Sequence, residues 1–245
     1  MAGARYTTAI AIAAVATVVS AAACGDDPDV GEQRADQVRR AAAEAGLSEE
    51  VQDFLVLAVG TADATFQVTY EIDDQTGARR VVVSQNPPDH RLDVVLPDGT
   101  VDATIRLDDD AYQCRQERSD WQCGRVEVPT PEAAIFDAIE LANRADELAA
   151  GTDDYDFAVE GRTLLGVEAR CLVTTLKPGH DTDPSRGDEG TLCLSPAGVV
   201  LLVDNVGTRQ EATAYTTDVP DGAFDLPAEA GNQAPSTTPS STAVP

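Results

Sequence analysis

The feature that most constrains this fold is a strict alternation of apolar and polar side chains that begins at Phe66. Every second residue from Phe66 to Ile72 is apolar, which is typical of a strand with one face buried and the other in water. Similar short runs follow at 79–85, 90–96, 100–107, 112–115 and 121–124, and turn signals such as Pro97-Asp98-Gly99 separate them. Six short strands in succession predict an antiparallel meander.

Helical patterns lie on both sides of this meander. Residues 32–45 are rich in Ala, Glu, Gln and Arg, and Gly46 ends that run. Ser48 is a predicted N-cap for a second helix, in which apolar residues recur at helical spacing from Val51 to Ala58. A third helix is predicted from Pro131 to Ala150, because proline is favoured at the first helical position.

Further strands complete the predicted sheet, at 155–165, 167–176, 191–195, 198–206 and 208–218, with a last edge at 224–227. The predicted fold class is α+β: a curled antiparallel half-barrel sheet of about eleven strands, with helices packed on its inner face. The predicted domain covers residues 32–227. Residues 228–245 are rich in Ser, Thr and Pro, so we expect them to be a disordered tail.

The N-terminus has the pattern of a secretion signal. Arg5 precedes an apolar stretch at 9–19, and small residues follow. The stretch is too short and too rich in alanine for a good membrane span. Residues 1–23 are therefore expected to be a signal peptide that directs the chain out of the cytoplasm.

The end of this segment, Ala21-Ala22-Ala23-Cys24-Gly25, resembles the bacterial lipoprotein signal. The resemblance implies that Cys24 receives diacylglycerol, becomes the new N-terminus and holds the protein at the membrane through acyl chains such as palmitate. Residues 24–31 would then be a lipidated polar tether. The alternative is an ordinary signal peptide cut near Ala23, with Cys24 incidental.

The charge of the chain restricts its partners. The formal net charge is −26 at pH 7. A strongly acidic chain lacks the basic footprint that nucleic-acid binding needs, so we expect no nucleic-acid partner. It would also be repelled by anionic lipid, so attachment to the membrane would depend on the lipid at Cys24.

Apart from Cys24, four cysteines remain, and an even number in a secreted chain predicts two disulfides. Four cysteines allow three pairings. We favour Cys114–Cys123 and Cys171–Cys193, because each pair is local and flanks a predicted turn or loop. The spacings do not match a zinc site.

Several segments resemble the LolA-like envelope lipoproteins of actinobacteria. They are Phe66 to Tyr70, Asn86 to Val94, Asp98-Gly99, Tyr112-Gln113-Cys114, Trp121-Gln122-Cys123, Cys193 to Val199, Tyr215, Val219-Pro220 and Phe224 to Ala228. The resemblance covers about residues 48–228 and depends on spacing and element order. It implies a curled half-barrel closed by helices over an apolar cavity. Family members carry lipids, lipoglycans or lipoproteins across the envelope, and the family has no catalytic residues.

Apolar side chains on the predicted inner strand faces are the candidates for a ligand pocket. These candidates are Phe66, Val68, Tyr70, Ile72, Val94, Leu96, Ile105 and Leu107. The same alternation would also be produced by a core packed solid under the helices. The resemblance favours the cavity, and the abundance of small side chains is consistent with it.

No other pattern predicts chemistry. His180 lies in a polar loop with no second histidine nearby, and His90 opens a strand, so neither predicts a metal site. Asp108-Asp109-Asp110 lacks the spaced ligands of a calcium loop and is expected to be a turn. We therefore expect no enzyme, metal or cofactor.

Two functional hypotheses follow. The first is an extracytoplasmic lipoprotein, anchored to the cell membrane, that binds a lipid or acyl chain without chemistry. The second is an envelope interaction or sensor module that binds a protein partner through the sheet surface.

Overall fold

The computed structural model describes residues 28–74, 77–126, 145–180, 188–205 and 208–231. The predicted signal peptide, Cys24, most of the predicted third helix and the end of the predicted tail lie outside these residues. Among the helices of the described ranges, none is both long enough and apolar enough to cross a bilayer.

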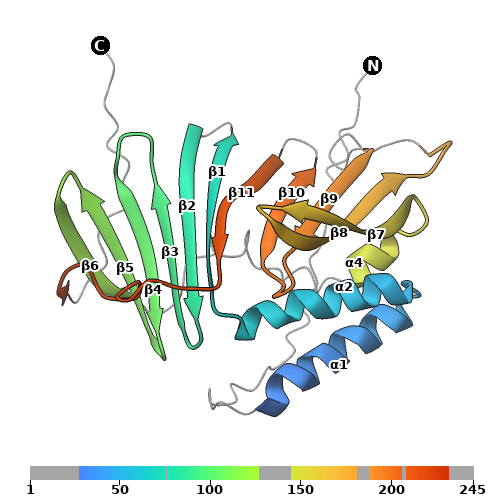
Figure 1. The fold of residues 1–245 in the computed structure, drawn as a ribbon, viewed down its shortest axis with the longest axis horizontal. Helices are drawn as coiled ribbons and strands as arrows, with labels where there is room; N and C mark the ends of the chain where they lie inside the picture. The colour runs from blue at the N-terminus through green and yellow to red at the C-terminus, as the bar shows by residue number, and fades with distance from the viewer. Residues whose placement is uncertain (1–27, 75–76, 127–144, 181–187, 206–207, 232–245) are drawn as a thin grey trace, which may run out of the picture.

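The helices lie beside one end of the sheet (Figure 1). They are α1 (Pro28–Glu44), α2 (Glu49–Val59), the short 3-10 helix η1 (Gly60–Asp63) and α4 (Ala145–Ala150). The predicted cap is confirmed, because the Ser48 side chain accepts a hydrogen bond from the Val51 N–H. The first helix starts at Pro28 instead of residue 32, so part of the expected tether at 24–31 is helical.

Most of the other described residues form one twelve-stranded sheet. Its strands are β1 (Phe66–Asp74), β2 (Gly77–Asn86), β3 (Asp89–Val95), β4 (Val101–Leu107), β5 (Asp110–Glu117), β6 (Asp120–Val126), β7 (Tyr155–Leu164), β8 (Val167–Leu176), β9 (Glu189–Leu194), β10 (Val200–Asn205), β11 (Thr208–Thr216) and β12 (Ala230–Gly231). Their spatial order is β12-β6-β5-β4-β3-β2-β1-β11-β10-β9-β8-β7. The two meanders meet where β1 pairs with β11, and β7 and β12 are the two edges.

This arrangement confirms the predicted curled, unclosed sheet with helices on one face. Two register shifts mark its centre, one beside Thr69 and Tyr70 and the other between Val200 and Leu202. Such irregularities bend strands and increase their twist. The curl brings α2 into contact with β7 and β8, at the end of the sheet away from β6.

The end of the chain differs from its predicted form. The expected last strand at 224–227 is a series of turns and bends. The edge strand forms instead at Ala230–Gly231, inside the stretch expected to be a disordered tail, and it pairs in parallel with Cys123 and Gly124 of β6. Alanine and glycine have low strand propensity, so the sequence pattern of this edge strand is weak.

The turn between β9 and β10 fixes the end of α2 against the sheet. The Thr61 hydroxyl lies 2.5 Å from the Gly198 carbonyl oxygen and 2.8 Å from that of Ala58. Gly198 has φ +77°, and a Cβ atom there would collide with the Leu57 carbonyl oxygen. Glycine is therefore required here, both for its backbone conformation and for the close approach of two backbones.

Candidate functional site: two apolar faces of the sheet

The first apolar face is centred on β1. Phe66, Val68, Tyr70 and Ile72 are only 1–3% exposed. Their cross-strand partners on β2 include the buried Val81 and Val83, and Leu92 on β3 continues the same row. These residues form one core cluster with side chains of β8 to β11, including Leu201 and Ala212. We name this surface the β1 face.

Tyr70 ties the β1 face to the neighbouring meander. Its hydroxyl donates a hydrogen bond of 2.6 Å to the Val200 carbonyl, at the start of β10. The ring is fully buried, and burial raises the pKa of the Tyr70 phenol far above its ordinary value. The phenol is therefore a permanent neutral donor, and its hydrogen bond has a structural role.

Gln210 carries a buried acceptor without a partner: in the part of the chain that the structure describes, its Oε1 is the one buried side-chain nitrogen or oxygen atom with no hydrogen bond. Gln210 lies on β11 opposite Ile72 of β1 and Val203 of β10, and it is 5% exposed. No hydrogen-bond donor reaches its Oε1. A buried acceptor without a donor costs about 1–3 kcal/mol, so this position calls for a function. Sequence reasoning missed it, although alternation with the buried Ala212 places Gln210 on the inner side.

Helices cover the neighbouring part of the sheet. Buried residues of α2, chiefly Phe54 and Leu55, pack in one cluster with Leu172 of β8, Leu194 of β9 and Val200 of β10. Phe157 and Val159 of β7 are half-buried against the same cluster. The predicted packing of helices on the inner face is thus observed over β7 to β10.

The register between β3 and β4 corrects the predicted pocket. Val94 is paired with Asp102, whereas Ile105 is paired with Arg91. Paired residues of neighbouring strands lie on the same face of a sheet, and successive residues alternate. The candidates therefore separate into two groups: Phe66, Val68, Tyr70, Ile72 and Val94 belong to the β1 face, and Ile105 and Leu107 point to the opposite side. Leu96 lies beyond the end of β3, in the turn before β4.

The sheet is therefore apolar on one side in β1 to β3 and on the other side in β4 to β6. Ala103, Ile105, Cys114 and Cys123 form a separate buried cluster, with Leu107, Tyr112 and Trp121 packed around it. We name this surface the β5 face. On the reverse of β4 and β5 the side chains are polar, as in the ion pair between Arg115 and Asp102.

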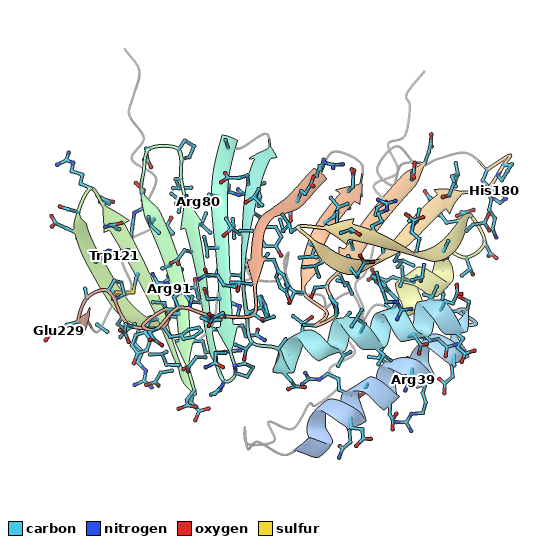
Figure 2. All side chains as sticks on the ribbon, in the orientation of Figure 1. Arg39, Arg80, Arg91, Trp121, His180 and Glu229 are labelled. Atoms are coloured by element: carbon cyan, nitrogen blue, oxygen red, sulfur yellow. A yellow bond between two sulfur atoms is a disulfide. The ribbon has the colours of Figure 1, made fainter. Side chains whose placement is uncertain are left out.

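The C-terminal strap, residues 219–231, covers the β5 face. In Figure 1 it leaves β11 and crosses the neighbouring strands to reach β6. Leu226 and Ala228 pack on the β5 cluster, and β12 ends the strap at the edge of β6. Figure 2 shows Trp121 and Glu229 at this end of the sheet and His180 at the other.

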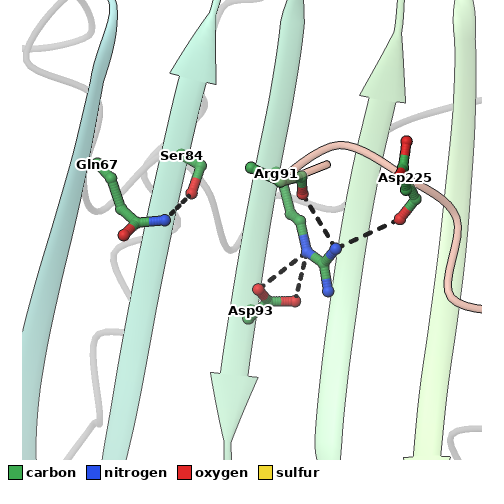
Figure 3. A network of polar contacts seen from close by, with 6 residues as sticks. Gln67, Ser84, Arg91, Asp93 and Asp225 are labelled. Atoms are coloured by element: carbon green, nitrogen blue, oxygen red, sulfur yellow. Dashed lines mark hydrogen bonds and ion pairs between the residues drawn. The ribbon is translucent and has the colours of Figure 1, made fainter. Parts of the chain in front are cut away.

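Arg91 holds the strap by its backbone (Figure 3). Its Nη1 donates to the carbonyl oxygens of Ala223 at 3.0 Å and Asp225 at 3.4 Å. Its Nε lies 2.9 Å from both carboxylate oxygens of Asp93. Burial raises the pKa of Asp93, and the attraction of Arg91 offsets only part of that rise.

Both favoured disulfides are present. Cys114–Cys123 joins directly paired residues of β5 and β6, and Cys171–Cys193 does the same for β8 and β9. The first bond belongs to the β5 cluster under the strap, and the second to the β1 core cluster.

Among the described residues, neither histidine belongs to a group that could hold a metal ion, and residues 181–187, next to His180, lie outside the described ranges. Burial and the nearby Arg106 lower the pKa of His90 to about 4, so its ring is neutral at pH 7. The Nδ1 of the exposed His180 lies 3.1 Å from an Asp154 carboxylate oxygen. Across the described ranges, no three His, Cys, Asp or Glu side chains gather in a way that could hold a metal ion.

Comparisons with known proteins return similarity in architecture only. No family model matches the sequence, and a search of curated proteins finds no relative. Among solved structures, MucB matches with 17% identity and a TM-score of 0.46, over 74% of this chain and 64% of that chain. The MucA/MucB complex of Pseudomonas aeruginosa matches with 17% identity and a TM-score of 0.41, over 67% and 56%. The chain therefore spans less than two thirds of both MucB chains.

The lipoprotein LppX of Mycobacterium tuberculosis also matches, with 11% identity and a TM-score of 0.36, over 71% of this chain and 99% of that chain. At such identities the similarity concerns the arrangement of sheet and helices alone. The architecture is the one that the LolA-like resemblance implied: a curled, unclosed sheet with helices against one face.

Proposed function

We propose that this protein is a membrane-anchored extracytoplasmic lipoprotein that binds an apolar ligand, a lipid or an acyl chain, on the β1 face without catalysis. The observation that carries the proposal is Gln210. Its unpartnered Oε1 is buried between Ile72 and Val203, and Arg79 of β2 lies beyond Ile72 in the same row. A mainly apolar surface with a buried acceptor is suited to a ligand that combines hydrocarbon with a hydroxyl or amide donor.

Two features support the proposed location outside the cytoplasm and at the membrane. The disulfides Cys114–Cys123 and Cys171–Cys193 form and persist in oxidising compartments outside the cytoplasm. The lipoprotein-like signal ends at Cys24, and α1 begins at Pro28. Four residues of extended chain span at most about 14 Å, so a lipid on Cys24 would hold the domain close to the bilayer surface.

Native mass spectrometry of the protein purified from its own membrane tests the proposal. We expect the wild type to retain a lipid in addition to its anchor. Gln210→Leu should lose or exchange that lipid, because it removes the only acceptor we assign to the ligand. Gln67→Leu is the matched control, since Gln67 faces the other side of β1 and bonds to Ser84. Recovery of no lipid from the wild type would contradict the proposal.

The anchor is tested separately. Cys24→Ser should release the protein into the extracellular medium, since the acyl chains would be lost. Fractionation of cells that express the variant measures this release. Retention of the variant in the membrane fraction would contradict lipid attachment at Cys24 and leave the ligand hypothesis unaffected.

A second candidate function, binding of a protein partner through the sheet surface, is favoured by one specific observation. The β5 face is apolar, lies on the opposite side of the sheet from the β1 face, and is covered by the C-terminal strap.

A further inference from the structure

We propose that the β5 face and the adjoining edge of β6 form a docking surface for an extended, neutral or basic segment of another protein, and that the C-terminal strap is the chain's own occupant of this surface. This inference is independent of the ligand site, because the two faces lie on opposite sides of the sheet.

The surface has both elements that strand addition requires. Ala103, Ile105, Cys114 and Cys123 provide an apolar floor, with Tyr112 and Trp121 half-buried around it. β6 spans Asp120–Val126, but β12 pairs with only Cys123 and Gly124 on its outer side. Among the described residues, only Ala230 and Gly231 pair with this edge, and the main-chain hydrogen bonds of such an edge give affinity when a peptide adds a strand.

The strap is a weakly held occupant. Only Ala230 and Gly231 pair with the sheet, whereas β6 pairs with β5 from Asp120 to Val126. Asp221, Asp225 and Glu229 are exposed. Segments with few buried contacts open well before the whole protein unfolds. Opening of the strap would uncover the β5 face while the paired strands beneath it remain intact.

The occupant seen in the structure indicates what a partner must look like. Leu226 and Ala228 both pack on the cluster across a bend of the chain at 227–228, and the strap becomes a strand only at Ala230 and Gly231. Arg91 binds the carbonyl oxygens of Ala223 and Asp225, so this contact recognises backbone and tolerates different side chains. The partner segment is thus one that places small or aliphatic residues on the β5 cluster and is extended where it pairs along β6.

Charge restricts the partner further. The chain has a formal net charge of −26, and the strap itself carries Asp221, Asp225 and Glu229. The guanidinium of Arg91 is already neutralised by Asp93. An acidic segment would therefore approach against the field of the whole protein, whereas a neutral or basic one would not. We therefore assign the surface to a neutral or basic partner segment that displaces the acidic strap.

Peptide binding to the mature protein tests this assignment, with fluorescence anisotropy as the readout. The probes are a labelled peptide of the strap sequence, residues 219–231, and an analogue with Asn, Asn and Gln in place of Asp221, Asp225 and Glu229. We expect the neutral analogue to bind at least about threefold more tightly at low salt, and the difference to shrink at about 0.5 M salt. Equal binding at both salt concentrations would overturn the charge argument.

Variants of the strap and of its floor identify the site. Leu226→Asp should loosen the strap and strengthen peptide binding about tenfold, whereas Glu229→Gln, at an exposed position, should leave binding near the wild-type level. Ala103→Glu should abolish binding in the Leu226→Asp background. Thr104→Glu is its matched control, because Thr104 is the next residue and faces the other side. Folded variants that all bind the peptide equally would overturn the proposal.

Two further measurements complete the test, and the first needs no variant. Hydrogen exchange of the wild type should show the amides of Ala230 and Gly231 exchanging about a hundredfold faster than those of β3 to β5. If the amides of the strap exchange only when the whole protein unfolds, the proposal is overturned. Light scattering should show a monomer for Leu226→Asp. A stable dimer would instead assign the surface to a second copy of the chain and overturn the proposal.

Discussion

Val94 and Ile105 lie on neighbouring strands and face opposite sides of the same sheet. Val94 shares its side with Asp102, and Ile105 shares its side with Arg91 and Ala103. The buried side of the sheet therefore changes between β3 and β4. The consequence is two separate apolar surfaces in one sheet: the β1 face contains Gln210, and the β5 face lies under the C-terminal strap.

Gly198→Ala should destabilise the protein by about 3 kcal/mol, because it combines a left-handed backbone with a collision against the Leu57 carbonyl oxygen. Gly46→Ala is the control: Gly46 has φ +76°, close to the +77° of Gly198, but open space around its Cβ position. This control should lose only about 1 kcal/mol. Urea unfolding measures both values, and equal losses would contradict the close approach of the β9–β10 turn to α2.

Gln210→Leu should stabilise the ligand-free, delipidated protein by about 1 kcal/mol, because it removes a buried acceptor that has no donor. Gln210→Glu should destabilise it, since a carboxylate at a buried position costs more than an amide. Thermal unfolding of the delipidated proteins measures both effects. A lower unfolding temperature for Gln210→Leu would show that the amide has a partner in solution.

Much of this fold could be predicted from the sequence. Alternation located β1, short runs between turn signals located β2 to β11, and the capping residue Ser48 and the apolar spacing of α2 were predicted correctly. Local patterns suffice for these elements because each depends on residues within a few positions of one another. The edge strand β12 was missed because its two residues pair through backbone alone.

The change of buried face was missed for a different reason. Alternation says which residues of one strand share a side, but only the register relates one strand to the next. Here the turn contained the necessary signal. Pro97, Asp98 and Gly99 form a three-residue loop between Leu96 and Thr100, which are hydrogen-bonded to each other. Counting outward from that loop pairs Val94 with Asp102, and places Ile105 on the other side.

Arg91→Lys should release the strap while the protein stays folded. A lysine keeps the charge beside Asp93, but it cannot contact that carboxylate and two carbonyl oxygens with the fixed geometry of a guanidinium. We expect faster exchange of the Ala230 and Gly231 amides, and a loss of about 1 kcal/mol in global stability. Arg106→Lys, at an exposed position of the neighbouring strand, is the control. Unchanged exchange in Arg91→Lys would show that the apolar contacts of Leu226 and Ala228 hold the strap without help.

His90 should make the stability of the protein fall below neutral pH. Its pKa is lowered from 6.5 to about 4 in the folded state, so the unfolded chain binds the proton more readily. The stabilising contribution is present above pH 6.5 and is lost as the pH falls toward 4, with about 2 kcal/mol gone at pH 5.

His90→Gln should flatten this dependence, because glutamine does not titrate and retains hydrogen-bonding capacity. Urea unfolding at pH 7, 6 and 5 measures wild type and His90→Gln. The largest difference in unfolding free energy between wild type and His90→Gln is expected at pH 5. At that pH the folded wild type keeps the ring neutral, whereas the unfolded chain binds a proton there. Parallel curves for wild type and His90→Gln would show that the ring is reached by water and protonates near its ordinary pKa.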